Sequence, residues 1–306
     1  MWNPDFATVR ITGNMAVSRF PLASWLWLVL LAGTWGTSYA LVELALVSFS
    51  PVQITFGRIA VGAVFIGGVC LSRRFSFDEF RGKWPALMAM AAFGMVFPFL
   101  LISWGQTHIQ SGAAGVVMAV MPLSVLLFSH LLLPEEPLTR WHWLGFLLAV
   151  CGVTVLMLPE IRWPLTGPLS GYLAVLGGAL CYGMSVVIAR WIRASNPWTS
   201  TVVLQCFSLM GMTPIVVAGG GLSDRIAPQS VVAVGALGLF ATGIAAVLFF
   251  HLVRTTSAAF VSSINFIVPI WALMVGVVFM NEAMPSTVYI ALLFILGGIA
   301  VSQKRA

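Results

Sequence analysis

The sequence predicts an all-α integral membrane protein in which ten transmembrane helices form two inverted repeats of five. The chain is 60% hydrophobic and only 8% charged, and its mean hydropathy is +1.01, which is typical of a protein whose solvent is mostly lipid. Its apolar stretches run continuously for about 20 residues, the length that crosses a bilayer as a helix. They lack the alternation of a membrane β-barrel, so we expect a helical bundle.

The apolar stretches follow one another with short connections along almost the whole chain. They cover residues 23–43, 51–71, 84–104, 111–133 and 140–158 in the first half, and 168–190, 199–218, 230–253, 257–279 and 285–302 in the second. We therefore expect one repeat over 23–158 and another over 168–302, with an N-terminal segment at 1–22 and a C-terminal one at 303–306. The first 20 residues are too polar for a signal peptide, so the first helix is expected to direct insertion.

The basic residues predict the orientation in the membrane. With the N-terminus in the cytoplasm, twelve of the fifteen lie on the cytoplasmic side, two lie outside, and Arg58 lies within a span. The twelve are Arg10, Arg19, Arg73, Arg74, Arg81, Lys83, Arg140, Arg190, Arg193, Arg254, Lys304 and Arg305, and the two are Arg162 and Arg225. This bias predicts a multi-pass protein of the bacterial inner (plasma) membrane with both termini cytoplasmic. It explains the net charge without a nucleic-acid partner.

The two halves match at an offset of 147 residues. Gly36 corresponds to Gly183, Ser38 to Ser185, Pro122 to Pro269 and Glu135 to Glu282. An odd number of helices per repeat inverts the second copy in the membrane. This arrangement is found in many secondary transporters, where substrate binds near the midplane between the halves. Duplicated helical scaffolds also serve channels and enzymes, which stay as alternatives.

Three segments resemble EamA domains. They are LLLPEEPLTRWHWLGFLLAVCGVTVLM (131–157), partly echoed by residues 279–302, then SPVQITFGRIAVGAVF (50–65) and WGTSYALVE (35–43). The resemblance covers nearly the whole chain as two repeats and implies the ten-helix drug/metabolite transporter superfamily. The interior, rich in Trp and Met, is most similar to aromatic amino-acid exporters of the YddG type. The chain departs from internal symmetry at Arg58, whose counterpart is Gln205.

Polar and aromatic residues at mid-membrane depth are the candidates for substrate binding, because they are costly there unless they line a cavity or meet a partner. Trp35 and Trp271 lie well inside spans, away from the interface where Trp usually sits. For a single Ser or Thr the alternative is a hydrogen bond to its own helix backbone, and for Trp104 it is a place at the interface. The predicted substrate-binding residues are Trp35, Ser38, Tyr39, Trp104, Tyr182, Ser185, Ser262, Asn265 and Trp271.

Six further residues are assigned mechanical or structural roles. Pro122 and Pro269 each remove a backbone hydrogen bond inside a span and are predicted hinges or static kinks. Glu135 and Glu282 lie between spans and are expected to cap the following helices. Arg58 is expected to snorkel or to pair with a nearby acid such as Glu43; the alternative is contact with a substrate carboxylate.

The remaining sequence signals narrow the function. The chain has no GxxxxGK[ST] motif for ATP, no metal-ligand spacing among its four histidines, and no Asp or Glu at mid-span. We therefore predict a transporter that is not an enzyme and has no cofactor or metal. The resemblance, together with the Trp-rich and Met-rich interior, implies export of amino acids, including aromatic and apolar ones, or of related metabolites. Protons are a candidate coupling ion, and facilitated diffusion is the alternative. Its partners are the small-molecule substrate and membrane lipid. Export of drugs or nucleobases is the near alternative, and an intramembrane enzyme the remote one.

Overall fold

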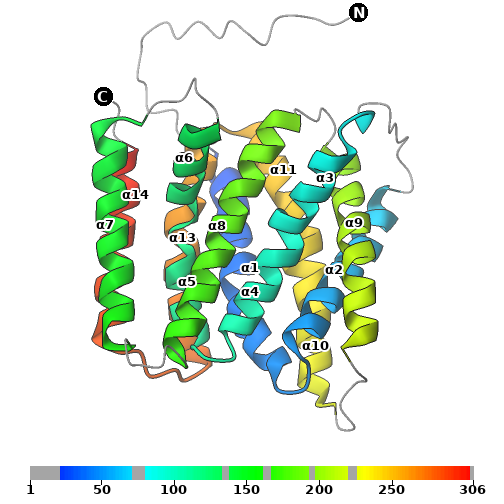
Figure 1. The fold of residues 1–306 in the computed structure, drawn as a ribbon, viewed down its shortest axis with the longest axis horizontal. Helices are drawn as coiled ribbons and strands as arrows, with labels where there is room; N and C mark the ends of the chain where they lie inside the picture. The colour runs from blue at the N-terminus through cyan, green and yellow to red at the C-terminus, as the bar shows by residue number, and fades with distance from the viewer. Residues whose placement is uncertain are drawn as a thin grey trace, which may run out of the picture.

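The computed structural model describes residues 21–70, 80–132, 138–160, 167–192, 197–219 and 226–303, and within these ranges the chain is a bundle of membrane-length helices (Figure 1). The first repeat contains five crossings. They are α1 (Leu22–Leu46), α2 (Pro51–Cys70), α3, η3 and α4 (Trp84–Ala91, Ala92–Val96 and Phe97–Gly105), α5 and α6 (Ser111–Met118 and Met121–Leu132), and α7 (Arg140–Met157), which ends in the short turn η4 (Leu158–Glu160).

The second repeat contains the same number of crossings and runs in the opposite direction. They are α8 (Pro168–Ile192), α9 (Pro197–Ala218), α10, η5 and α11 (Pro228–Ala236, Leu237–Ile244 and Ala245–Thr255), α12 and α13 (Ala258–Ser262 and Ile264–Phe279), and α14 (Ser286–Ser302). In the described ranges, nine crossings are long and apolar enough to span a membrane, and the tenth, α14, has 17 residues. The predicted fold class is confirmed.

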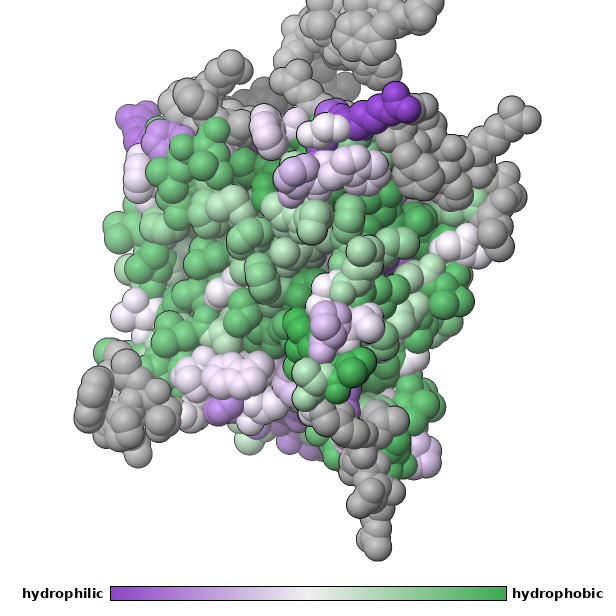
Figure 2. All heavy atoms as spheres, turned by 45° about the vertical axis from the view of Figure 1, so that its right-hand side comes forward, coloured by the Kyte–Doolittle hydropathy of each residue, from purple (hydrophilic) through white to green (hydrophobic). Residues whose placement is uncertain are grey.

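The face of the bundle drawn in Figure 2 is largely apolar across its middle, and polar residues gather toward its upper and lower edges. Large aliphatic and aromatic side chains stand exposed along the crossings, where a soluble protein would bury them. Examples are Leu30, Val64, Phe97, Leu147, Val217, Val232 and Leu293. This belt faces lipid, and the chain is a multi-pass membrane protein.

The first helix of each repeat packs against the fourth crossing of the other repeat. In α1, a Cβ added to Gly36 would lie 2.8 Å from Trp271 Cδ1 in α13. In α8, a Cβ on the equivalent Gly183 would lie 2.9 Å from the backbone of Ser124 in α6. The matched glycines therefore permit two equivalent close approaches that join the repeats.

The last helices of the two repeats, α7 and α14, form a pair at one edge of the bundle (Figure 1). A Cβ on Gly298 would lie 3.2 Å from the backbone nitrogen of Ala149, so these helices approach at backbone distance. Neither helix supplies a residue to the cavity described below.

The third crossing of each repeat contains a π-helical segment at the corresponding position. Adding 147 to Ala92 and Val96 gives residues 239 and 243, which lie within η5 (Leu237–Ile244). Hydropathy predicts uninterrupted helices here, because the extra residue of a π-turn leaves the apolar pattern unchanged. Such segments are frequent at functional sites, and both of these supply residues to the cavity.

The fourth crossings of the two repeats are broken at different points. Ala119 and Val120 form a turn between α5 and α6, so that Pro122 is the second residue of α6, where a missing amide costs little. The corresponding Pro269 lies inside α13, beyond a break at Ser263. The prediction of two equivalent mid-helix prolines is therefore wrong for Pro122, because the helix restarts beside it.

Candidate functional site

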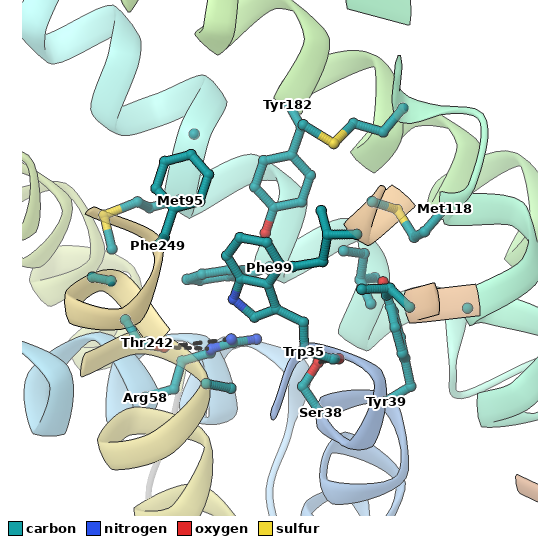
Figure 3. Close-up of a pocket in the computed structure, with 18 of the residues that line it drawn as sticks. Trp35, Ser38, Tyr39, Arg58, Met95, Phe99, Met118, Tyr182, Thr242 and Phe249 are labelled. Atoms are coloured by element: carbon teal, nitrogen blue, oxygen red, sulfur yellow. Dashed lines mark hydrogen bonds between the residues drawn. The ribbon is translucent and has the colours of Figure 1, made fainter. Parts of the chain in front are cut away.

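A cavity of about 370 Å³ lies between the repeats and is lined by residues of both. Figure 3 shows Trp35 at its centre, with Tyr182 on one side and Arg58 and Thr242 on the other. Pockets that hold small metabolites usually fall in this size range and combine apolar walls with a few polar groups.

The cavity lining is largely made of repeat-equivalent pairs. Sixteen of its residues form eight pairs in which the second number is the first plus 147. The pairs are Trp35 and Tyr182, Arg58 and Gln205, Gly94 and Ala241, Met95 and Thr242, Phe99 and Ala246, Ile102 and Phe249, Met118 and Asn265, and Met121 and Val268. The backbone is thus nearly two-fold symmetric around the cavity, while the two members of every pair differ. The two repeats therefore present different side chains to a ligand in the cavity.

Aromatic rings form much of the wall. The ring centroids of Trp35 and Phe249 are 5.9 Å apart, and those of Phe99 and Tyr182 are 6.4 Å apart. Met95 and Met118 add polarisable thioethers that adapt to ligands of different shape. These groups suit an aromatic or branched apolar body.

Arg58 is the single cation of the lining and is only 6% exposed. Its Nε and one terminal nitrogen donate to Thr242 Oγ1, each at 3.4 Å, and its Cζ lies 3.7 Å from the centroid of the Phe99 ring. The Thr242 hydroxyl donates in turn to the carbonyl of Leu237 at 3.1 Å, an i to i−5 contact within η5. The π-helical segment thereby aims Thr242 at the arginine.

The predicted pairing of Arg58 with Glu43 is wrong in this structure. Glu43 instead accepts from the backbone N–H of Ser111 at 3.2 Å. Across the described residues Arg58 makes no ion pair with any carboxylate. The cause is the packing of η5 against α2, which places Thr242 beside the guanidinium, and a sequence contains no direct record of that neighbour.

Gln205 is a second buried polar group of the lining. It is 1% exposed, and neither its Nε2 nor its Oε1 has a hydrogen-bond partner among the residues that the structure describes. Buried amides nearly always have partners. An unpartnered amide that faces a cavity is a feature of a site completed by ligand or water.

Seven of the residues singled out from the sequence line the cavity. Five of them are predicted binding residues, one is the predicted hinge Pro269, and one is Arg58. Ser38 is also tied to its own helix, because its Oγ donates to the carbonyl of Trp35 at 2.6 Å. The seven are Trp35, Ser38, Tyr39, Arg58, Tyr182, Asn265 and Pro269. Their roles in binding and bending stay predictions.

The structure places four other predicted binding residues outside the lining. Trp271 donates through Nε1 to Thr37 Oγ1 at 3.0 Å and fills the space over Gly33 and Gly36, so its indole is used in helix packing. The hydroxyl of Ser185 donates to the carbonyl of Tyr182 at 3.0 Å. Ser185 therefore bonds the backbone of its own helix, which is the alternative to substrate binding given above for a single serine.

Trp104 and Ser262 are the other two. Trp104 is 43% exposed, as expected of an interfacial tryptophan, and its ring lies against that of His108 with centroids 4.5 Å apart and planes tilted by 41°. Ser262 is the last residue of α12, just before the break at Ser263, and does not reach the cavity.

Glu282 caps a helix, although not the one that follows it. Its carboxylate accepts from the backbone N–H of Ser111 at 2.9 Å, from the hydroxyl of the same residue, and from the N–H of Gly112 at 3.0 Å. It therefore caps α5 of the other repeat, while α14 begins without a side-chain cap. Asn281, which has a left-handed φ of 54°, turns the chain at this point. The predicted role of Glu135 concerns a position outside the described residues.

Several lining residues were not among the sequence candidates. The most important are Gln205 and Thr242, followed by Met95, Phe99, Met118 and Phe249. The repeat offset leads to two of these six, because adding 147 to Arg58 gives Gln205 and subtracting 147 from Asn265 gives Met118. Thr242 required knowledge of η5.

A bundle of two inverted five-helix repeats around a cavity near the centre of the crossings is the architecture of a secondary transporter. Comparison with known families agrees. Residues 23–158 and 169–303 each match the EamA-like transporter family, and the chain belongs to that family. It is therefore a member of the drug/metabolite transporter superfamily, and the predicted resemblance is confirmed.

Curated relatives cover most of the chain at low identity. The chain is 23% identical over 288 residues to a probable terminal-alkyne amino-acid exporter of Streptantibioticus cattleyicolor, which covers 91% of this chain and 92% of the relative. It is 24% identical to the uncharacterized inner membrane transporter YedA of Escherichia coli, over 84% and 83% of the two chains. It is also 24% identical to the protein PagO of Salmonella typhimurium, over 78% and 79%. A crystal structure at 22% identity shares the fold with a TM-score of 0.63, over 92% of this chain and 97% of the other.

Proposed function

We propose that this protein exports amino acids, including those with aromatic or apolar side chains, across the bacterial inner membrane by alternating access to the central cavity. The observation that carries the proposal is the repeat-paired lining of that cavity. Its aromatic and thioether walls lie beside a small polar region formed by Arg58, Gln205 and Thr242. An amino acid has this division between an apolar body and a polar end.

The symmetry of the lining supports alternating access. In transporters with inverted repeats, the two access states arise when the repeats exchange conformations around a fixed midplane site. The central cavity receives equivalent positions from both repeats, so a ligand in it would stay in contact with both while access changes. Transport of this kind needs no ATP.

A relative further supports export of amino acids. The relative in Streptantibioticus cattleyicolor is named a probable exporter of an amino acid. The basic residues favour cytoplasmic termini, and we propose that the chain has this orientation in the membrane.

Uptake into liposomes tests the proposal directly. Purified protein is reconstituted, and entry of each of the twenty amino acids is measured with and without a pH gradient. We expect saturable transport that is fastest for aromatic and branched apolar amino acids. Transport of nucleobases or amphiphilic drugs with no amino acid transported would contradict the proposal and favour a different cargo for the same fold. Dependence on the pH gradient would identify protons as the coupling ion.

A further inference from the structure

We infer that the cavity selects small organic monocarboxylates, whose carboxylate is held by Arg58 of the first repeat and Gln205 of the second. The inference rests on the proposed transport function and adds the charge of the cargo and the position of its charged end. An ammonium group on the ligand is accepted, as in an amino acid, and is not required.

The first step of the argument is the unmatched charge of Arg58. A guanidinium has five N–H donors in a planar fork that matches a carboxylate. Here two of its nitrogens contact a single neutral acceptor, Thr242 Oγ1, at the long distance of 3.4 Å, and one of its faces lies on Phe99. A cation this deeply buried is stabilised when an anion joins it, and the part of the chain that the structure describes offers it no carboxylate.

The second step is the position of Gln205 beside the same group. Gly62 lies one turn beyond Arg58 on α2. A Cβ on Gly62 would lie 3.2 Å from Cβ of Thr242 and 3.4 Å from Nε2 of Gln205, so these side chains meet over that glycine. The amide N–H₂ of Gln205 has no partner among the described residues and is available to donate. Guanidinium and amide donors thus converge on one region of the cavity.

The third step is the composition of the rest of the lining. It contains no Asp or Glu, so a cationic ligand without a carboxylate would meet the charge of Arg58 uncompensated. The neutral acceptors Ser38 and Asn265 can receive an ammonium group that arrives together with a carboxylate. The apolar body then contacts Trp35 and Phe249. Loss of the carboxylate should therefore cost far more binding than loss of the amine.

A four-compound series in the wild-type protein tests this preference without any mutation. The compounds are L-phenylalanine, 3-phenylpropionate, 2-phenylethylamine and L-phenylalaninamide, each competing with labelled L-phenylalanine in counterflow. We expect 3-phenylpropionate to compete within about tenfold of L-phenylalanine, and the two cations without a carboxylate to compete at least about tenfold less than 3-phenylpropionate, since charge-assisted hydrogen bonds are the strong ones. Equal competition by the amine and the carboxylate would overturn the inference.

The same compounds are also tested for binding, by thermal shift of the protein in detergent, so that transport and recognition fail separately. Carboxylates that stabilise the protein without being transported would contradict the proposed function and support the inference. Transport of L-phenylalanine with no preference for a carboxylate would support the proposed function and contradict the inference. Absence of both binding and transport for all four compounds would contradict both.

Variants at the paired positions make the test specific to the two residues. Arg58→Gln gives both repeats the same residue and should remove most of the preference for 3-phenylpropionate over 2-phenylethylamine. Arg140→Gln, the same charge change at the exposed start of α7, is the matched control and should retain it. Arg58→Gln combined with Gln205→Arg moves the cation to the other repeat and should restore the preference in part. A preference unchanged in correctly folded Arg58→Gln protein would overturn the inference.

Discussion

Glu43 and Glu282 accept hydrogen bonds from the same backbone N–H, that of Ser111, at 3.2 and 2.9 Å. One carboxylate comes from α1 and the other from the turn before α14, 239 residues later in the chain (282 − 43). The N-terminus of α5 is therefore the point where the first and last helices of the protein are joined. Glu282 makes the larger set of contacts, since it also accepts from Gly112.

Replacing Glu282 with Ala should destabilise the fold. It leaves the Ser111 hydroxyl and the Gly112 N–H without their acceptor and the Ser111 N–H with only the longer hydrogen bond to Glu43, and the loss of a partner typically costs about 1 to 3 kcal/mol per buried group. We expect a clearly lower thermal midpoint in detergent. Glu43→Ala is the control, because it removes one long hydrogen bond and should lower the midpoint less. Equal midpoints for both variants would contradict this ranking.

Gly36→Ala should weaken the packing of α1 on α13. The added Cβ would lie 2.8 Å from Trp271 Cδ1, and such overpacking usually costs about 1 to 3 kcal/mol. The yield of monodisperse protein and its thermal midpoint measure the effect. Gly67→Ala is the matched control, because a Cβ at Gly67 in α2 meets nothing within 4 Å. If the two variants behave alike, close approach at Gly36 is not needed.

Asn265→Leu should weaken substrate binding. It removes one donor and acceptor from the lining, and a lost buried partner costs about 1 to 3 kcal/mol, or roughly 5-fold to 150-fold in apparent affinity. Concentration dependence of transport in liposomes measures it. Ser185→Ala is the control, because Ser185 bonds its own helix outside the lining. Wild-type kinetics in the Asn265 variant would place the polar contact elsewhere.

Trp35→Ala should discriminate by substrate size. Trp35 lies at the centre of the cavity in Figure 3 and contacts Phe249, so its loss removes contact area from bulky ligands first. We expect a larger fall in transport of phenylalanine than of alanine. Trp143→Ala, at a tryptophan 51% exposed on α7, should leave the ratio unchanged. An equal fall in transport of both amino acids would rule out a role for Trp35 in selecting bulky substrates.

Pro122→Ala and Pro269→Ala should each leave insertion intact and slow transport, with the double variant slowest, if both prolines permit helix bending. The structure adds a ranking, because Pro269 lies inside α13 and lines the cavity, whereas Pro122 begins α6. The Pro269 variant should therefore show the larger effect. Turnover of the double variant at the wild-type rate would exclude a hinge at either site.

The crossings, their order and the inversion of the repeats could be predicted, because hydrophobic length and internal repetition are written directly in the sequence. The π-helical segments could not be predicted. One extra residue in a turn rotates every later side chain about the helix axis, and the hydropathy of the segment does not record this change. Thr242 shows the consequence. It reaches Arg58 only because η5 is not an ordinary α-helix.

The candidate site could be predicted in part. Trp35, Tyr182 and Asn265 were found from polarity and depth, and they do line the cavity. Trp271 has the same depth and chemistry, yet it turns toward Thr37. The depth of a residue in the membrane can be predicted from its position along a span. The neighbour that its side chain contacts depends on how the helices pack. The counterpart of Arg58, Gln205, was visible as a broken match between the repeats and is now a partner in the proposed site.

Arg58 gives the lining one formal positive charge with no acid to offset it, and this has an electrical consequence. A zwitterion leaves that charge unchanged when it binds, whereas a carboxylate without an amine neutralises it. A cycle that carries such a carboxylate out and returns the empty site therefore moves one negative charge outward. A membrane potential that is negative inside favours this movement by about 2.3 kcal/mol per 100 mV. The voltage alone would then drive carboxylates out of the cell, while amino acids would follow their concentration gradients.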